Sequence, residues 1–130
     1  MNPVQYQAED GVATITLADE ENKNALGQSL TAGLFESLTS ANEDPDVRVI
    51  TLTHSGTVFC AGANLKERSA GTGAPDMGSI GFDKALSLIQ TGPKPVVARI
   101  TGAAMGGGVG LAAAAQGLPW QQADQLDHVR

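Results

Sequence analysis

The stretch GAAMGGGVGLAAAA, residues 102–115, places three consecutive glycines between an apolar, strand-like run and a run of alanines typical of a helix. Glycine is costly inside regular structure because it loses more backbone freedom on folding than any other residue. Two interpretations account for its use here. The glycines either let the helix pack closely against a sheet, or they let a ligand approach the free N–H groups at the helix N-terminus, which bear partial positive charge.

The segment CAGAN, residues 60–64, is built in a similar way. It follows a short predicted strand, Val58–Phe59, and Asn64 can cap a helix that begins after it. Both turns follow strands that we expect to be parallel, so the turns should emerge at the same edge of the sheet. Two facing turns could then donate two N–H groups to one oxygen, which suits the negative charge of an enolate or thioester oxygen.

Hydrophobic patterning predicts a layered α/β fold in one domain. Asp10-Gly11 between two alternating runs is a strong hairpin pattern, and three leucines from Leu30 to Leu38 recur at helical spacing. A later helix has one apolar face, formed by Phe82, Ala85, Leu86 and Ile89. In chain order we expect strands Val4–Glu9 and Val12–Leu17, a helix over 29–42, strands Val47–Thr53 and Val58–Phe59, a helix over 80–91, strand Val96–Ile100 and a helix over 107–116.

Composition argues against several classes of protein. The 130-residue chain has a formal net charge of −6, which disfavours nucleic acid as a general partner. Its single cysteine, Cys60, fits a reducing compartment, and the cysteine and histidines are not spaced as a metal site. We see neither a secretory leader nor an apolar run of membrane-spanning length, so we expect a cytoplasmic protein that does not bind membranes.

Three motifs together resemble the crotonase family, the enoyl-CoA hydratase/isomerase superfamily. They are KNAL at 23–26, FCAGANLKE at 59–67 and KPVVARITGAAMGGGVGLAAA at 94–114. The resemblance covers roughly residues 4–115, so we divide the chain into a crotonase-like core, 1–115, and a divergent tail, 116–130. It implies a crotonase-like spiral of ββα units, a homotrimer and an acyl-CoA thioester substrate. Coenzyme A would then be part of the substrate, and no separate cofactor is expected.

The resemblance also implies site residues, carried over by matching the motifs. The backbone N–H groups of Ala63 and Gly107 would form an oxyanion hole for the thioester oxygen. The residues expected to contact the coenzyme A part of the substrate are Lys23, Ala25, Ala61, Gly62, Asn64, Leu65 and Lys66.

The sequence departs from the family where proton transfer is expected. Many hydratases have a glutamate three residues after the oxyanion glycine, and this chain has Gly110 there. Hydration with two carboxylates needs one to activate water and one to protonate carbon. After Gly110 the only carboxylates are Asp124 and Asp127, which we interpret as solvated rather than catalytic.

The tail also departs from the family, from residue 116 onward, and the chain is shorter than typical members. We interpret this as a truncated, frameshifted or fragmentary form that ends before the C-terminal helical part; a naturally short relative is the other interpretation. Two functions stay open. One is a hydratase or isomerase that stabilises an enolate, with weak activity or none. The other is a non-catalytic remnant with a coenzyme A-binding or oligomerising surface. We do not expect the family-type homotrimer without the C-terminal half.

Two further residues have ordinary structural interpretations. Cys60 precedes the Ala-Gly turn with no histidine nearby in the sequence, so we expect a small core residue rather than a nucleophile. His54 follows a strand that we expect to be buried, and we expect it to be a loop residue.

Overall fold

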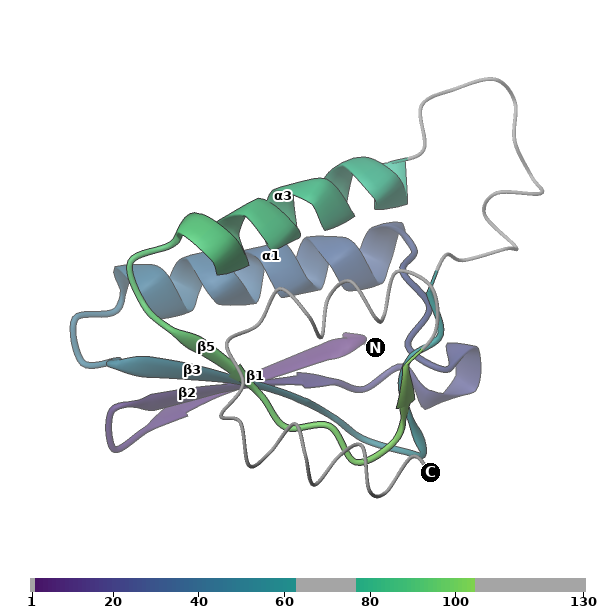
Figure 1. The fold of residues 1–130 in the computed structure, drawn as a ribbon, viewed down its shortest axis with the longest axis horizontal. Helices are drawn as coiled ribbons and strands as arrows, with labels where there is room; N and C mark the ends of the chain where they lie inside the picture. Colours follow the sequence, from purple (N-terminus) through teal and green to yellow (C-terminus); the bar gives the residue numbers. More distant parts are fainter. Residues whose placement is uncertain (1, 63–76, 105–130) are drawn as a thin grey trace.

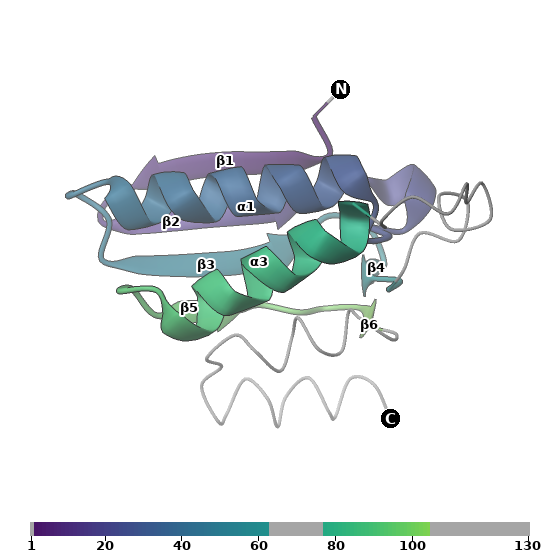
Figure 2. The ribbon, with the colours of Figure 1, turned by 90° about the horizontal axis from the view of Figure 1, so that it is seen from above.

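The computed structural model describes residues 2–62 and 77–104, which form a sheet with two helices packed on one face (Figure 1). The main sheet has four strands in the order β1-β2-β3-β5. A second, two-stranded sheet joins β4 and β6 at one end of the molecule (Figure 2). This arrangement confirms a mixed α/β fold. The helix expected over 107–116 and the cap expected at Asn64 lie outside the described residues.

The N-terminal hairpin forms as predicted. β1 (Val4–Glu9) pairs antiparallel with β2 (Val12–Leu17). Asp10 and Gly11 between them have φ angles of 53° and 83°. Two positive φ angles in a two-residue loop match the right-handed twist of the flanking strands, and Asp-Gly adopts them readily.

The rest of the main sheet is parallel. β3 (Val49–His54) lies beside β2, and β5 (Val96–Ala98) lies beside β3. Alternate residues of β2 and β3 are buried, including Ile15, Leu17 and Leu52. This period-2 pattern turns one apolar face of the sheet toward the helices.

Two helices cover that face. α1 (Gln28–Glu43) lies over β1 and β2, and α3 (Met77–Thr91) lies over β3 and β5 (Figure 2). The predicted apolar faces are confirmed. Buried on the helices are Leu30, Leu34 and Leu38 of α1 together with Ala85 and Ile89 of α3, while Phe82 and Leu86 are half-buried against the same core.

The observed boundaries differ from the predicted ones where hydrogen bonding, rather than periodicity, ends an element. α3 begins at Met77 instead of residue 80, β3 runs from Val49 to His54 instead of Val47–Thr53, and β5 ends at Ala98 instead of Ile100. A short 3-10 helix, η1 (Glu20–Asn22), follows β2 and was not among the expected elements. The strand β6 (Ala103–Ala104) was not predicted because two residues are too few to show a period.

Among the helices of the described residues, none combines the length and the hydropathy that a membrane crossing requires.

Lys94, in the connection between α3 and β5, forms hydrogen bonds to the end of α1. Its Nζ donates to the carbonyl oxygen of Ala41 at 2.7 Å and also to the carbonyl oxygen of Asp44. Carbonyl groups at a helix C-terminus have no partner within the helix. A cation at that end also interacts favourably with the helix dipole.

Replacing Lys94 by methionine keeps the aliphatic stem but removes the cation and its donors. We expect Lys94→Met to lower the free energy of unfolding by about 1–2 kcal/mol. Urea titration followed by circular dichroism measures the change. Lys84→Met on the exposed side of α3 is the control, with an expected change within about 0.5 kcal/mol. Equal losses in the two variants would contradict a role for Lys94 at the end of α1.

Candidate functional site

β4 and β6 are neighbouring parallel strands, and each leads to one of the segments for which we predicted oxyanion donors. β4 (Val58–Cys60) pairs with β6, with Val58 opposite Ala103 and Cys60 opposite Ala104. Parallel neighbours present their carboxyl ends at the same edge of a sheet. The two strands therefore deliver the chain to one edge (Figure 2). Ala63, Asn64, Leu65, Lys66 and Gly107, which we predicted to act in this region, lie outside the described residues.

The loop around residue 24 lies directly against the end of β4. The N–H of Ala61 donates to the carbonyl oxygen of Lys23 at 3.0 Å, and the N–H of Leu26 donates to the carbonyl oxygen of Gly62 at 2.6 Å. The structure thus brings together four of the predicted substrate-binding positions: Lys23, Ala25, Ala61 and Gly62. Because these contacts use backbone groups, they fix the distance between the loop and the end of β4 independently of the side chains.

Asn24 explains why the loop takes this shape. Lys23 and Asn24 have φ angles of 53° and 55°, and asparagine is one of the few residues that enter this left-handed region readily. The Asn24 side chain is 1% exposed. Its Oδ1 accepts the N–H of Asp19 at 2.8 Å, and its Nδ2 donates to the carbonyl oxygen of Val58 at 3.0 Å. This one side chain therefore joins the loop to β4.

A half-open depression lies beside this loop. It encloses about 190 Å³ and is lined by Glu20, Lys23, Ser55, Gly56, Thr57 and Val58. Gly56 has a φ of +74°, and a β-carbon on it would lie 2.9 Å from Cγ of Glu20. Glycine therefore lets the two walls approach each other. The ammonium group of Lys23 is the cationic group in this lining and suits an anionic part of a ligand.

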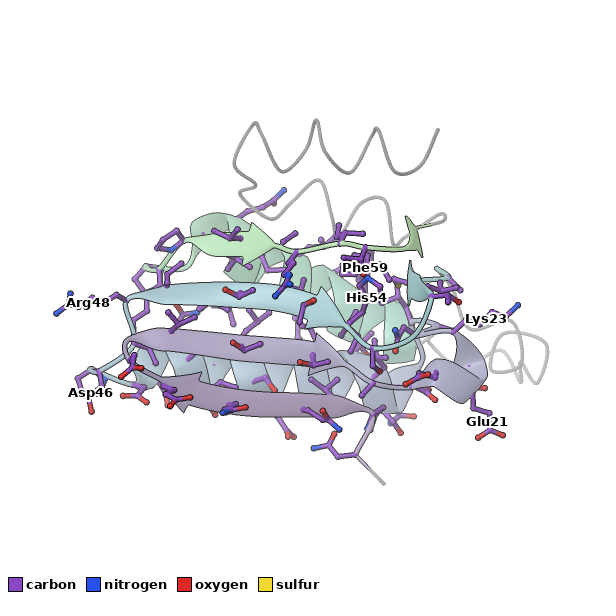
Figure 3. The ribbon with its side chains drawn as sticks, turned by 90° about the horizontal axis from the view of Figure 1, so that it is seen from below. Glu21, Lys23, Asp46, Arg48, His54 and Phe59 are labelled. Carbon is purple, nitrogen blue, oxygen red and sulfur yellow. The ribbon has the colours of Figure 1, made fainter. Side chains whose placement is uncertain are left out.

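His54 is not a loop residue, and that prediction was wrong. It is the last residue of β3, opposite Leu17 in the register with β2. The alternation of β3 turns its side chain inward, leaving it 9% exposed. Figure 3 shows His54 and Phe59 close together at the same end of the sheet as Lys23, opposite Asp46 and Arg48.

Cys60 is a buried core residue, as predicted. Burial raises the pKa of its thiol, although a hydrogen bond with the backbone of Gly62 acts in the opposite direction. Desolvation disfavours the thiolate, which is the nucleophilic form. Within residues 2–62 and 77–104, no group of His, Cys, Asp and Glu side chains is arranged to hold a metal ion.

Comparison with known proteins gives a family match over most of the chain. The model of the family described as enoyl-CoA hydratase/isomerase matches residues 7–118. A Mycobacterium tuberculosis protein named "Probable enoyl-CoA hydratase" is 34% identical over 115 residues, which are 88% of this chain and 45% of that protein. The 1,2-epoxyphenylacetyl-CoA isomerase of Escherichia coli is 37% identical over 117 residues, with 86% and 45% of the two chains covered.

Solved structures agree with the sequence matches. The crystal structure of an enoyl-CoA hydratase from a Polaromonas species superposes with a TM-score of 0.78 at 36% identity, covering 87% of this chain and 46% of that one. The chain thus spans about 45% of the length of these curated relatives.

Removing the side chain of Asn24 tests its contribution to the loop. Asn24→Ala leaves the N–H of Asp19 and the carbonyl of Val58 without their partners and puts alanine in a left-handed conformation. We expect a loss of about 2–4 kcal/mol in the free energy of unfolding, measured by urea titration. Asn22→Ala is the matched control: its half-buried amide donates to the Asp19 carboxylate, and we expect a loss within about 1 kcal/mol. Equal losses of unfolding free energy in the two variants would show that the burial and hydrogen bonds of Asn24 do not stabilise the loop.

The thiol of Cys60 should be unreactive in the folded protein. Its raised pKa lowers the thiolate fraction at pH 8, and burial blocks access of the reagent. We expect reaction with a disulfide reagent to be more than about tenfold slower in buffer than in concentrated urea. Because Cys60 is the only cysteine, the absorbance change reports this site alone. Fast labelling of the folded protein would show that the thiol is accessible.

Proposed function

Since the chain belongs to the enoyl-CoA hydratase/isomerase family, the crotonases, we propose that it binds an acyl-CoA thioester and stabilises the negative charge of its enolate. One observation supports this most strongly. The parallel pair β4–β6 brings the ends of two strands, each followed in the sequence by glycines, to one edge of a sheet beside the loop around Lys23. A thioester held at that edge would have backbone donors on one side and the loop on the other.

The donors we propose are the N–H groups of Ala63 and Gly107. They follow β4 and β6 by a few residues each. Two fixed N–H groups aimed at one oxygen stabilise an oxyanion more than a neutral carbonyl, so they favour the enolate over the bound substrate. Such donors are typically worth about 10²–10³ in rate each.

The coenzyme A part of the substrate would lie along the loop and the end of β4. Backbone hydrogen bonds join Lys23 to Ala61 and Leu26, the neighbour of Ala25, to Gly62. The exposed ammonium group of Lys23 beside the depression can meet a phosphate group. Asn64, Leu65 and Lys66 follow in the chain, and we propose that they extend the same binding surface.

The sequence offers few candidate side chains for proton transfer. Gly110 stands where many hydratases have a glutamate. General acid and base groups contribute about 10²–10⁴ each. We therefore propose that the chain polarises a bound thioester but hydrates crotonyl-CoA very weakly or not at all.

Calorimetric titration of the whole chain with acetoacetyl-CoA tests the binding function. This β-keto thioester forms an enolate, so an oxyanion hole should bind it at least about tenfold more tightly than butyryl-CoA. Gly107→Pro removes one N–H donor and should abolish this preference, whereas Gly107→Ala keeps the donor and should preserve it. Equal affinities for the two thioesters in the unmodified chain would contradict the oxyanion hole, and no affinity for either would contradict acyl-CoA binding.

The hydration step is measured separately, by loss of the enoyl thioester absorbance of crotonyl-CoA. We expect no rate above that of a heat-denatured sample. Steady turnover by the purified chain would show that a side chain other than the expected carboxylates moves the protons.

A further inference from the structure

The pairing of β4 with β6 is too short to fix its own geometry. The two strands have three and two residues, and their register is irregular between Val58 and Cys60. Two-stranded ribbons are at best marginally stable without further packing. The relative position of the two strand ends must therefore depend on contacts made outside the ribbon.

His54 provides those contacts. Its Nε2 accepts the N–H of Thr101, two residues before β6, at 3.0 Å, and lies 3.3 Å from Oγ1 of the same residue. Its ring packs edge-on against Phe59 of β4, with centroids 5.6 Å apart and planes at 75°. One buried ring at the end of β3 thus contacts both β4 and the segment that enters β6 (Figure 3).

The hydrogen bonds define the protonation of the ring. Nε2 can accept the N–H of Thr101 only if it has no proton of its own, so the proton of the neutral ring is on Nδ1. Nδ1 lies 3.3 Å from the carbonyl oxygen of Ser55, toward which it can donate. The ring is therefore held from both sides and cannot turn over without losing one partner.

Gly102 brings the entering segment into close contact with the same group of residues. A β-carbon at this position would lie 2.2 Å from the carbonyl oxygen of Thr57 and 3.1 Å from Cε1 of His54. Only a residue without a side chain allows this approach. The backbone at 101–102 is thus in contact with His54 on one side and with the start of β4 on the other.

We propose that His54 is a positioning residue for the acyl-thioester site: its ring, joining Thr101 to Phe59, sets the distance between the ends of β4 and β6. This rests on the proposed function, because the thioester oxygen would be bound by donors that follow those two ends. The neutral imidazole acts through the backbone and does not touch the substrate.

Three variants separate positioning from general stability. His54→Leu keeps much of the volume but removes the acceptor. His54→Gln places an oxygen the same number of bonds from the backbone as Nε2 and should rescue the contact. Thr53→Val is the matched control. Thr53 is the neighbour of His54 on β3, and its hydroxyl donates to the carbonyl oxygen of Arg99, which follows β5, at 2.9 Å.

Nuclear magnetic resonance tests the geometry without any ligand. In the unmodified chain we expect imidazole nitrogen shifts of a ring protonated at Nδ1. His54→Leu should speed hydrogen exchange at the Thr101 amide at least about tenfold and shift the amide signals of Ala63 and Gly107. His54→Gln and Thr53→Val should leave these signals near their original positions. A ring protonated at Nε2, or equal amide shifts in His54→Leu and Thr53→Val, would overturn the proposal. The imidazole nitrogen shifts are measured on the unmodified chain, so they test the proposal even if His54→Leu does not fold.

Titration with acetoacetyl-CoA then tests the link to binding. We expect His54→Leu to weaken binding about tenfold, with His54→Gln and Thr53→Val within about threefold of the unmodified chain. Unchanged affinity in His54→Leu would overturn the positioning role while leaving the proposed function intact. If the unmodified chain does not bind the thioester, the proposed function is wrong. The resonance measurements then test by themselves whether His54 sets the distance between the ends of β4 and β6.

Discussion

The parallel pairing of β4 with β6 is the constraint on which the candidate site depends. It brings the chain after Cys60 and the chain after Ala104 to one edge, although the two segments are separated by the whole of α3 and β5. The main sheet makes this possible, because β3 and β5 are themselves parallel neighbours. Any ligand that needs donors from the residues after both strands therefore depends on a ribbon only a few residues long.

Side chains bonded to backbone groups compensate for that short ribbon. Asn24 joins its own loop, which follows β2, to Val58, and His54 joins the end of β3 to Thr101. Both side chains are buried, and both use their polar atoms on main-chain partners. A buried polar group left without its partner costs more than an ordinary hydrogen bond gains. Each side chain therefore specifies one arrangement of its neighbours instead of merely filling space.

Binding and proton transfer depend on different kinds of group in this fold. Backbone N–H groups stabilise an oxyanion through their position, so the proposed donors depend on where the strands place the chain. Proton transfer needs a titratable side chain at a defined place, and Gly110 has no such group. The proposed binding of a thioester and the proposed weakness of hydration are therefore separate properties, which different parts of the chain would determine.

The sequence by itself determined the order of the elements and the face that each of them buries. Leu34 and Ile15 are buried as their spacing predicts, and Asp10-Gly11 turns as expected, because these are local demands made by a helix, a strand and a two-residue loop. The motifs also indicated that Lys23 and Ala61 belong to one site, and they are adjacent, while the oxyanion donors remain predictions. Only the tertiary structure decided the strand β6 and the contacts of Asn24 and His54. Val58 and Thr101, their partners, lie 34 and 47 positions away along the chain. These contacts depend on how the strands pack, so a pattern of neighbouring residues cannot predict them.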